Sequence, residues 1–76
     1  MELDKIFGKQ MKLLRTEKGY SQALLAEKTG LHLNSISFLE RGINQPSLTT
    51  IFLLAKAFEM RPEELVALVS KEYVEK

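Results

Sequence analysis

The sequence has 76 residues and a net charge of +1, so it lacks the strongly basic balance that by itself marks a nucleic-acid-binding protein. A chain this short buries only about 60% of its unfolded surface, which supports a single domain over residues 1–76. With no cysteine and one histidine, His32, we expect no disulfide, metal or cofactor. No apolar run approaches the roughly 20 residues of a membrane span, and the N-terminus has no secretory signal, so we expect a cytoplasmic protein.

Hydrophobic periodicity predicts an all-α chain, and the first helix covers residues 3–18. Phe7, Met11 and Leu14 are spaced to form one apolar stripe along this helix. Gly19 follows directly and is placed to end it. This helix should therefore lay one face on a core formed with later elements.

Two short helices follow, separated by a tight turn. The first is predicted over residues 22–29, with Ser21 as N-cap and Gly30 supplying the left-handed turn that ends it. The second is predicted over residues 33–41 and ends at Gly42.

The rest of the chain contains two more predicted helices. Ser47 caps a helix over residues 48–58 after the loop "INQPS". Pro62 suits the first position of the fifth helix, and residues 71–76 either extend it or fray. Short connections require the five helices to pack as one compact domain.

The spacing of residues around the two short helices predicts a helix-turn-helix unit over about residues 22–41. Ala26 is small where the second helix of the pair crosses closely, and Gly30 turns the chain between them. Larger apolar residues fill the space between the helices. They are Leu25, Leu31, Ile36 and Leu39.

These features resemble the lambda-repressor/Cro-type helix-turn-helix transcription regulators, over about residues 7–68. The matching segments are "FGKQMKLLRTEKGYSQALLAEKTGL", "ISFLERG", "PSLTTIFLLAKAF" and "RPEELV". Within that family, "GLH" and "IS.LERG" look most like controller proteins of restriction-modification systems. The resemblance implies a five-helix domain that binds DNA with the helix-turn-helix.

The resemblance also implies that Arg15 pairs with Glu40, because family members carry an arginine and a glutamate at these positions. Arg15 lies at the edge of the first helix's apolar stripe, and Glu40 adjoins the inward face of the third helix. We therefore expect a partly buried ion pair that clamps the recognition helix. The alternative is two unrelated surface charges, worth about 0–1 kcal/mol even in contact.

The outward arc of the third helix supplies the candidate base-reading residues. Asn34 is the best of them, because its amide pairs bidentately with adenine. Two apolar residues share this surface and would recognise thymine methyl groups, pack against the protein itself, or form a protein-binding patch. The candidate base-reading set is Leu33, Asn34, Ser37 and Phe38.

Contacts to the DNA backbone are expected at the start of the second helix and around the end of the third. The exposed amides and positive dipole end of a helix N-terminus favour a phosphate, and the resemblance implies this role for Gln22. The alternative for each candidate is a solvated surface residue, and for Arg41 it is also a contact with a guanine. The candidates are Ser21, Gln22, Arg41, Asn44 and Gln45.

Three residues depart from the family pattern. Leu24 replaces the glutamate that would complete a capping box with Ser21. Thr29 takes a position that is usually apolar, and His32 is a weak N-cap for the third helix. We expect His32 to be neither a metal ligand nor a catalytic base.

The fifth helix and tail, about residues 62–76, are expected to form a homodimer. We expect Leu65 and Leu68 to point into the core, and Val66, Val69 and Tyr73 to face a twofold partner. The alternative is that all of them close the core of one chain. A dimer would double the DNA contacts and read two half-sites.

The sequence thus predicts a dimeric, sequence-specific transcription regulator that binds a pseudo-palindromic operator, with RNA polymerase as a further partner. The alternatives are an antitoxin-type regulator and a module that bridges proteins through Leu24, Leu33 and Phe38. We do not expect an enzyme, because the sequence has no cysteine nucleophile, carboxylate cluster or glycine-rich phosphate loop.

Overall fold

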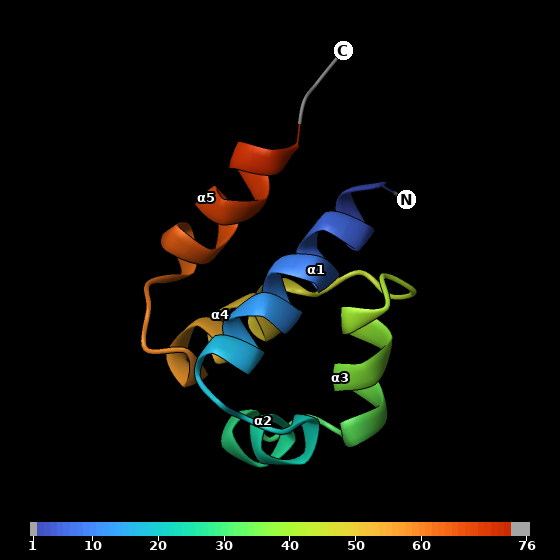
Figure 1. Cartoon of the computed structure of the whole chain (residues 1–76), viewed down its shortest axis with the longest axis vertical. Coiled ribbons are helices and arrows are strands. Elements are labelled where there is room, and N and C mark those ends of the chain that lie inside the picture. Colours follow the sequence, from blue (N-terminus) through green and yellow to red (C-terminus); the bar gives the residue numbers. More distant parts are fainter. Residues whose placement is uncertain (1, 74–76) are drawn as a thin grey trace.

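The computed structural model describes residues 2–73 and contains five helices in that part of the chain (Figure 1). The predicted all-α fold is confirmed, and each helix boundary lies close to its predicted place. The helices are α1 (Glu2–Glu17), α2 (Gln22–Thr29), α3 (Leu33–Glu40), α4 (Leu48–Ala57) and α5 (Pro62–Glu72). None of the described helices is both long and apolar enough to cross a membrane.

The helix-turn-helix pair and the fifth helix lie at opposite ends of the molecule. α1 contacts both α3 and α5, whereas α2 contacts α3 and α4. In Figure 1, α2 and α3 lie at the lower end, and the start of α1 approaches the end of α5 at the upper end. α1 therefore packs against helices at both ends of the molecule.

Each of the five helices contributes at least one completely buried side chain to the core. These residues have no exposed surface, and burying each one stabilises the fold by about 1.5–3 kcal/mol. Phe7, Leu39 and Phe58 extend the same cluster. The largest fully buried side chains are those of Met11, Leu25, Ile36, Leu54 and Leu65.

The helix ends around the tight turn form as their capping residues predict. The Ser21 hydroxyl oxygen accepts from the Leu24 amide at 3.0 Å. Gly30 has a left-handed φ of 77°, and its amide donates to the Ala26 carbonyl at 2.8 Å. His32 makes no side-chain capping bond, in keeping with its prediction as a weak N-cap.

The end of α3 lies one residue earlier than predicted, at Glu40. Arg41 is the C-cap, and Gly42 adopts a left-handed φ of 72° directly after it. The Ile43 amide then donates to the Phe38 carbonyl at 3.0 Å, which satisfies one of the last carbonyls of the helix.

Gly8 allows α1 to approach the end of α3 closely, a role that the sequence analysis missed. Gly8 is buried, and a Cβ atom at this position would clash with the Leu39 carbonyl oxygen and lie 2.7 Å from that of Glu40. Only a residue without a side chain fits between these two helices.

Thr29 occupies the core with its hydroxyl fully bonded. Its side chain donates toward the Leu25 carbonyl at 2.8 Å and accepts from the Leu31 amide at 3.2 Å. The polar atom therefore has partners although the residue is buried.

The expected orientation of α5 needs one correction, at Val69. Leu65 is fully buried and Leu68 half-buried, as expected, but Val69 is only 7% exposed and belongs to the core. Val69 lies one helical turn after Leu65 and therefore shares its inward face. Val66 and Tyr73 are 46% and 39% exposed, and the remaining tail, 74–76, lies outside the described residues.

Candidate nucleic-acid interface

α3 has one face in the core and one face toward solvent. Ile36 and Leu39 are buried against α1 and α2, so the helix can rotate very little. On the opposite side, Asn34 is exposed, and Leu33 and Phe38 are 48% and 37% exposed. The sequence-predicted base-reading surface is therefore accessible.

A buried ion pair holds the end of α3 to α1, as the sequence predicts. The Arg15 Nε atom lies 2.5 Å from Glu40 Oε2, and Arg15 Nη2 lies 3.1 Å from Glu40 Oε1. The two side chains are 12% and 3% exposed. This bidentate geometry and the exclusion of water make the contact stronger than a surface ion pair.

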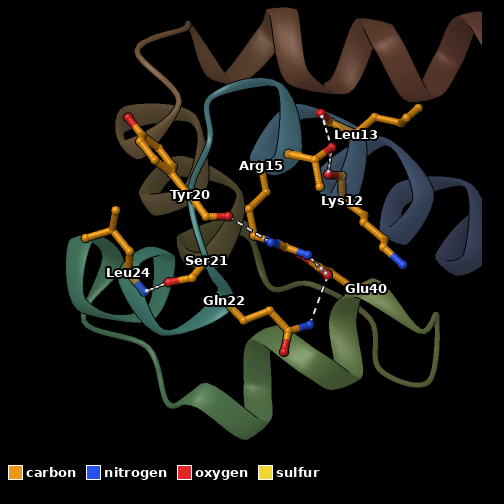
Figure 2. A network of polar contacts seen from close by, with 9 residues as sticks. Lys12, Leu13, Arg15, Tyr20, Ser21, Gln22, Leu24 and Glu40 are labelled. Atoms are coloured by element: carbon orange, nitrogen blue, oxygen red, sulfur yellow. Dashed lines mark hydrogen bonds and ion pairs between the residues drawn. The ribbon is translucent and has the colours of Figure 1, made fainter.

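Two further bonds extend this ion pair into a network that joins three helices (Figure 2). Arg15 Nη1 donates to the Tyr20 carbonyl at 2.8 Å, which ties down the turn before α2. Gln22 Nε2 donates to Glu40 Oε1 at 3.0 Å. The Glu40 carboxylate thus accepts three hydrogen bonds and fixes α1, α2 and α3 relative to one another.

Gln22 combines this structural contact with its predicted place at the start of α2. Its side chain is half-buried, and one of its two amide hydrogens is directed to Glu40. The second hydrogen makes no hydrogen bond to any residue from 2 to 73. Spacing alone gave no signal for the Glu40 contact, because it depends on how α2 and α3 pack.

Two polar side chains on the outer face of α3 have no hydrogen-bond partner in the described part of the chain. Neither Asn34 nor Ser37 makes a side-chain hydrogen bond to any residue from 2 to 73. Asn34 is exposed and Ser37 is half-buried. Their hydrogen-bonding groups are therefore available to an external ligand, with Asn34 in the first turn of the helix.

Arg41 contacts Phe38 at the other end of this face. The Arg41 Cζ atom lies 5.9 Å from the centroid of the Phe38 ring, within the range of a cation–π contact. The sequence analysis considered these residues separately and missed this contact, although three residues along a helix bring side chains together.

The other predicted DNA-backbone residues lie in different settings. Ser21 is exposed and uses its oxygen to cap α2. Asn44 and Gln45 are exposed in the loop after α3, and Gln45 also lines a groove formed with residues of α1, α4 and α5. Ser21, Asn44 and Gln45 are uncharged, so they add no positive charge to the candidate interface.

An apolar groove of about 370 Å³ lies where α1, α4 and α5 meet. Phe7 and Val69 line it from the core side, and Leu3, Val66 and Tyr73 are exposed hydrophobic residues along it. The groove therefore combines a hydrophobic floor with an accessible hydrophobic rim, on α5 and the start of α1.

Comparisons with known proteins agree with this arrangement. The helix-turn-helix family model matches residues 11–65. The helix-turn-helix-type transcriptional regulator y4dJ of Sinorhizobium fredii is 35% identical over 66 residues, which cover 87% of this chain and 86% of that protein.

Two solved structures have the same fold. The restriction-modification controller protein C.AhdI from Aeromonas hydrophila is 38% identical with a TM-score of 0.82, covering 86% of this chain and 98% of that one. SinR, solved in complex with DNA, is 31% identical with a TM-score of 0.74, covering 79% of this chain and 97% of that one.

The family match covers most of the core and the whole helix-turn-helix, including Arg15, Gln22 and Glu40. The structural matches place the same five-helix architecture in regulators of this type. The chain belongs to the lambda-repressor/Cro-type helix-turn-helix family of DNA-binding transcription regulators.

Proposed function

We propose that the protein binds an approximately palindromic operator as a homodimer, with α3 of each protomer in the major groove. The observation that carries this proposal is the outer face of α3. It presents the unpartnered Asn34 and Ser37 side chains, whereas the inner face is fixed by the core and by Glu40. A rigid helix with free polar groups on one side suits direct reading of base edges.

The first turn of α3 would meet the bases, as it does in this mode of docking. Asn34 would pair with an adenine, and Ser37 would contribute a less selective bond. The SinR structure, which contains DNA, supports DNA as the ligand of this fold.

Backbone contacts would come from the start of α2 and the loop after α3. Gln22 keeps one amide hydrogen for a phosphate while its other hydrogen is bonded to Glu40. Ser21 and Asn44 are exposed beside these elements. Because few of these groups are charged, each protomer would neutralise few phosphates and bind weakly alone.

The second copy of the chain would occupy the apolar groove beside α5. Val66 and Tyr73 are the exposed residues there that would contact the partner, and Val69 would contribute only its small exposed edge. A domain of this size gains stability by burying such a surface, and a twofold arrangement matches a palindromic site. The operator's position relative to RNA polymerase would then determine activation or repression.

Selection of bound duplexes from a random-sequence pool tests the DNA-binding proposal. We expect two inverted half-sites about 34–36 Å apart, each containing an adenine opposite Asn34. If the folded protein enriches no sequence at low salt, the proposal is wrong. The apolar residues Leu24, Leu33 and Phe38 would then favour the protein-bridging alternative.

Sedimentation of a matched pair of variants tests the dimer. Val66→Asp places a charge in the groove and should give a folded monomer with weakened operator binding. Ala67→Asp makes the same change at the next exposed position of α5, outside the groove lining, and should leave the dimer intact. A monomeric wild-type protein would remove this part of the proposal.

A further inference from the structure

We propose that Phe38 is a positioning residue for Arg41, and that it holds the guanidinium where it pairs with the edge of a guanine. This inference rests on the proposed function, because it assigns a specificity contact to the same DNA-reading helix. The observation is the 5.9 Å separation between Arg41 Cζ and the Phe38 ring centroid. Both residues are exposed, so the pair is accessible to a ligand.

The contact directs Arg41 back along the helix. Arg41 follows the last residue of α3, and Phe38 lies three residues earlier, about 4.5 Å closer to the N-terminal end. A side chain that extends freely from Arg41 would reach the DNA backbone beside the end of the helix. The ring instead holds the guanidinium beside the outer face of α3, one helical turn after Asn34, rather than beyond the end of the helix.

The remaining donors of Arg41 fit a guanine. The contact with the ring occupies no hydrogen-bond acceptor, so the N–H groups of the guanidinium remain available to a ligand. Arg41 makes no side-chain hydrogen bond or ion pair with any residue from 2 to 73. In the major groove, guanine presents two acceptors, O6 and N7, which match two adjacent N–H groups of an arginine.

This assignment changes the expected role of Phe38. From the sequence, the ring was expected to read a thymine methyl group, to pack against the protein, or to form part of a protein-binding patch. The structure shows the ring in contact with a cation, on a residue that is 37% exposed. Phe38 would then act on specificity through Arg41, and Leu33 is left as the apolar residue for a thymine methyl.

A pair of Phe38 variants tests the positioning role on the operator found by selection. The quantity measured is the loss of affinity when the guanine is replaced by adenine. Phe38→Leu removes the ring but keeps an apolar side chain, and it should lower this discrimination about two- to fivefold. Phe38→Tyr keeps the ring and should retain it. Equal behaviour of the two variants would overturn the proposal.

Repeating the comparison in an Arg41→Ala background shows whether Phe38 acts through Arg41. Arg41→Ala alone should lower the discrimination about 5- to 150-fold, and Phe38→Leu should then add nothing. If Phe38→Leu still weakens binding without Arg41, and only on thymine-containing rather than uracil-containing DNA, Phe38 reads the methyl group itself. That result would overturn the proposal.

Replacing the guanine by 7-deazaguanine removes the N7 acceptor and tests the other partner. We expect a loss of affinity for the wild-type protein and no such loss for Arg41→Ala. Arg41→Lys keeps the charge without the planar fork and should also lose discrimination. A loss that is uniform across sequences, with a smaller salt dependence, would assign Arg41 to a phosphate and contradict the inference.

These outcomes are separable from failure of the proposed function. Absence of any selected site would disprove sequence-specific DNA binding by the wild-type protein. A selected site on which Phe38 and Arg41 act independently would leave DNA binding intact and disprove only their pairing. Thermal unfolding of each variant confirms that the exposed substitutions leave the fold unchanged.

Discussion

The inner and outer faces of α3 differ in how their polar groups are satisfied. On the inner side, the Glu40 carboxylate is 3% exposed and accepts three hydrogen bonds from Arg15 and Gln22. On the outer side, Asn34 and Ser37 have no side-chain partner among residues 2–73. One helix therefore carries both the attachment to the scaffold and the surface available to a ligand.

This difference predicts that substitutions on the two faces of α3 have separable effects on stability and on DNA binding. Substitutions on the inner face leave buried charged groups without a partner or create steric clashes, so they lower the free energy of unfolding. Substitutions on the outer face involve side chains that are already exposed to solvent. They should change the affinity for DNA and leave the free energy of unfolding nearly unchanged. The expected effects below test that separation, from the largest to the smallest.

Arg15→Ala should lower the free energy of unfolding by about 3–5 kcal/mol, because it leaves the buried Glu40 carboxylate without its charged partner. Urea denaturation monitored by circular dichroism measures this change. The double variant Arg15→Met with Glu40→Leu removes both charges and should recover most of the loss.

Lys18→Ala provides the matched control for that ion pair. Lys18 bonds Glu59 at 3.0 Å, but both groups are solvent-exposed, so its removal should change stability far less. Equal losses of stability for Arg15→Ala and Lys18→Ala would show that the network around Glu40 stabilises the fold no more than a surface ion pair does.

Gly8→Ala should lower the free energy of unfolding by about 1–3 kcal/mol, since the added methyl group would press against the Leu39 and Glu40 carbonyls. Alanine is ordinarily the better helix residue by roughly 0.5–1 kcal/mol, so the expected sign is opposite to propensity. Lys12→Ala, at an exposed position of α1, is the control and should be nearly neutral. A stabilised Gly8→Ala protein would contradict the close packing of α1 on α3.

Asn34→Ala should weaken binding to the selected operator by about 1–3 kcal/mol and leave nonspecific affinity nearly unchanged. Fluorescence anisotropy on selected and scrambled duplexes measures both quantities. The free energy of unfolding should stay within about 0.5 kcal/mol of wild type, because the residue is exposed. An equal loss on all DNA would rule out base reading by Asn34.

The smallest effect on the free energy of unfolding is expected at the ion pair between Lys9 of α1 and Glu72 of α5. Lys9 Nζ at 2.6 Å and Gln10 Nε2 at 2.8 Å donate to Glu72, and these bonds, the one from Lys9 first, hold the pKa of Glu72 below its usual 4.5. The folded state therefore binds this proton less readily than the unfolded state. Its contribution is present above the unfolded pKa and is lost as the pH falls through the lower, folded value.

A comparison of wild type with Glu72→Gln across this acid range measures that contribution. The stability difference between the two proteins should shrink as the pH falls below about 4.5 and the Glu72 carboxylate is protonated. A constant difference down to the acid limit would show that the Lys9 and Gln10 bonds do not link α1 to α5 electrostatically.

Local signals in the sequence predicted the parts of the fold that depend on neighbouring residues. Ser21, Gly30 and Ser47 marked helix ends that the structure confirms. The inward positions Leu25, Ile36 and Leu39 followed from helical periodicity. These features depend on spacing along one chain segment, which a sequence displays directly.

Contacts between helices were harder to predict. The Arg15 and Glu40 pair was expected only through a family resemblance, and the bond from Gln22 to Glu40 was not expected. The prediction that Val69 faces a twofold partner was wrong, because its spacing of four residues from Leu65 places both on the buried face of α5. Gly8 is an isolated glycine within a helical pattern. Such a glycine is a signal of close packing between helices, and the role of Gly8 was not predicted from the sequence.

The central claim is that the outer face of α3 reads a DNA sequence. The most direct test is the ratio of dissociation constants for a scrambled duplex and the selected operator, measured at one fixed, physiological salt concentration. The account predicts a ratio of at least about 10³, with Asn34→Ala reducing it. A ratio near one for a folded wild-type protein would contradict the account.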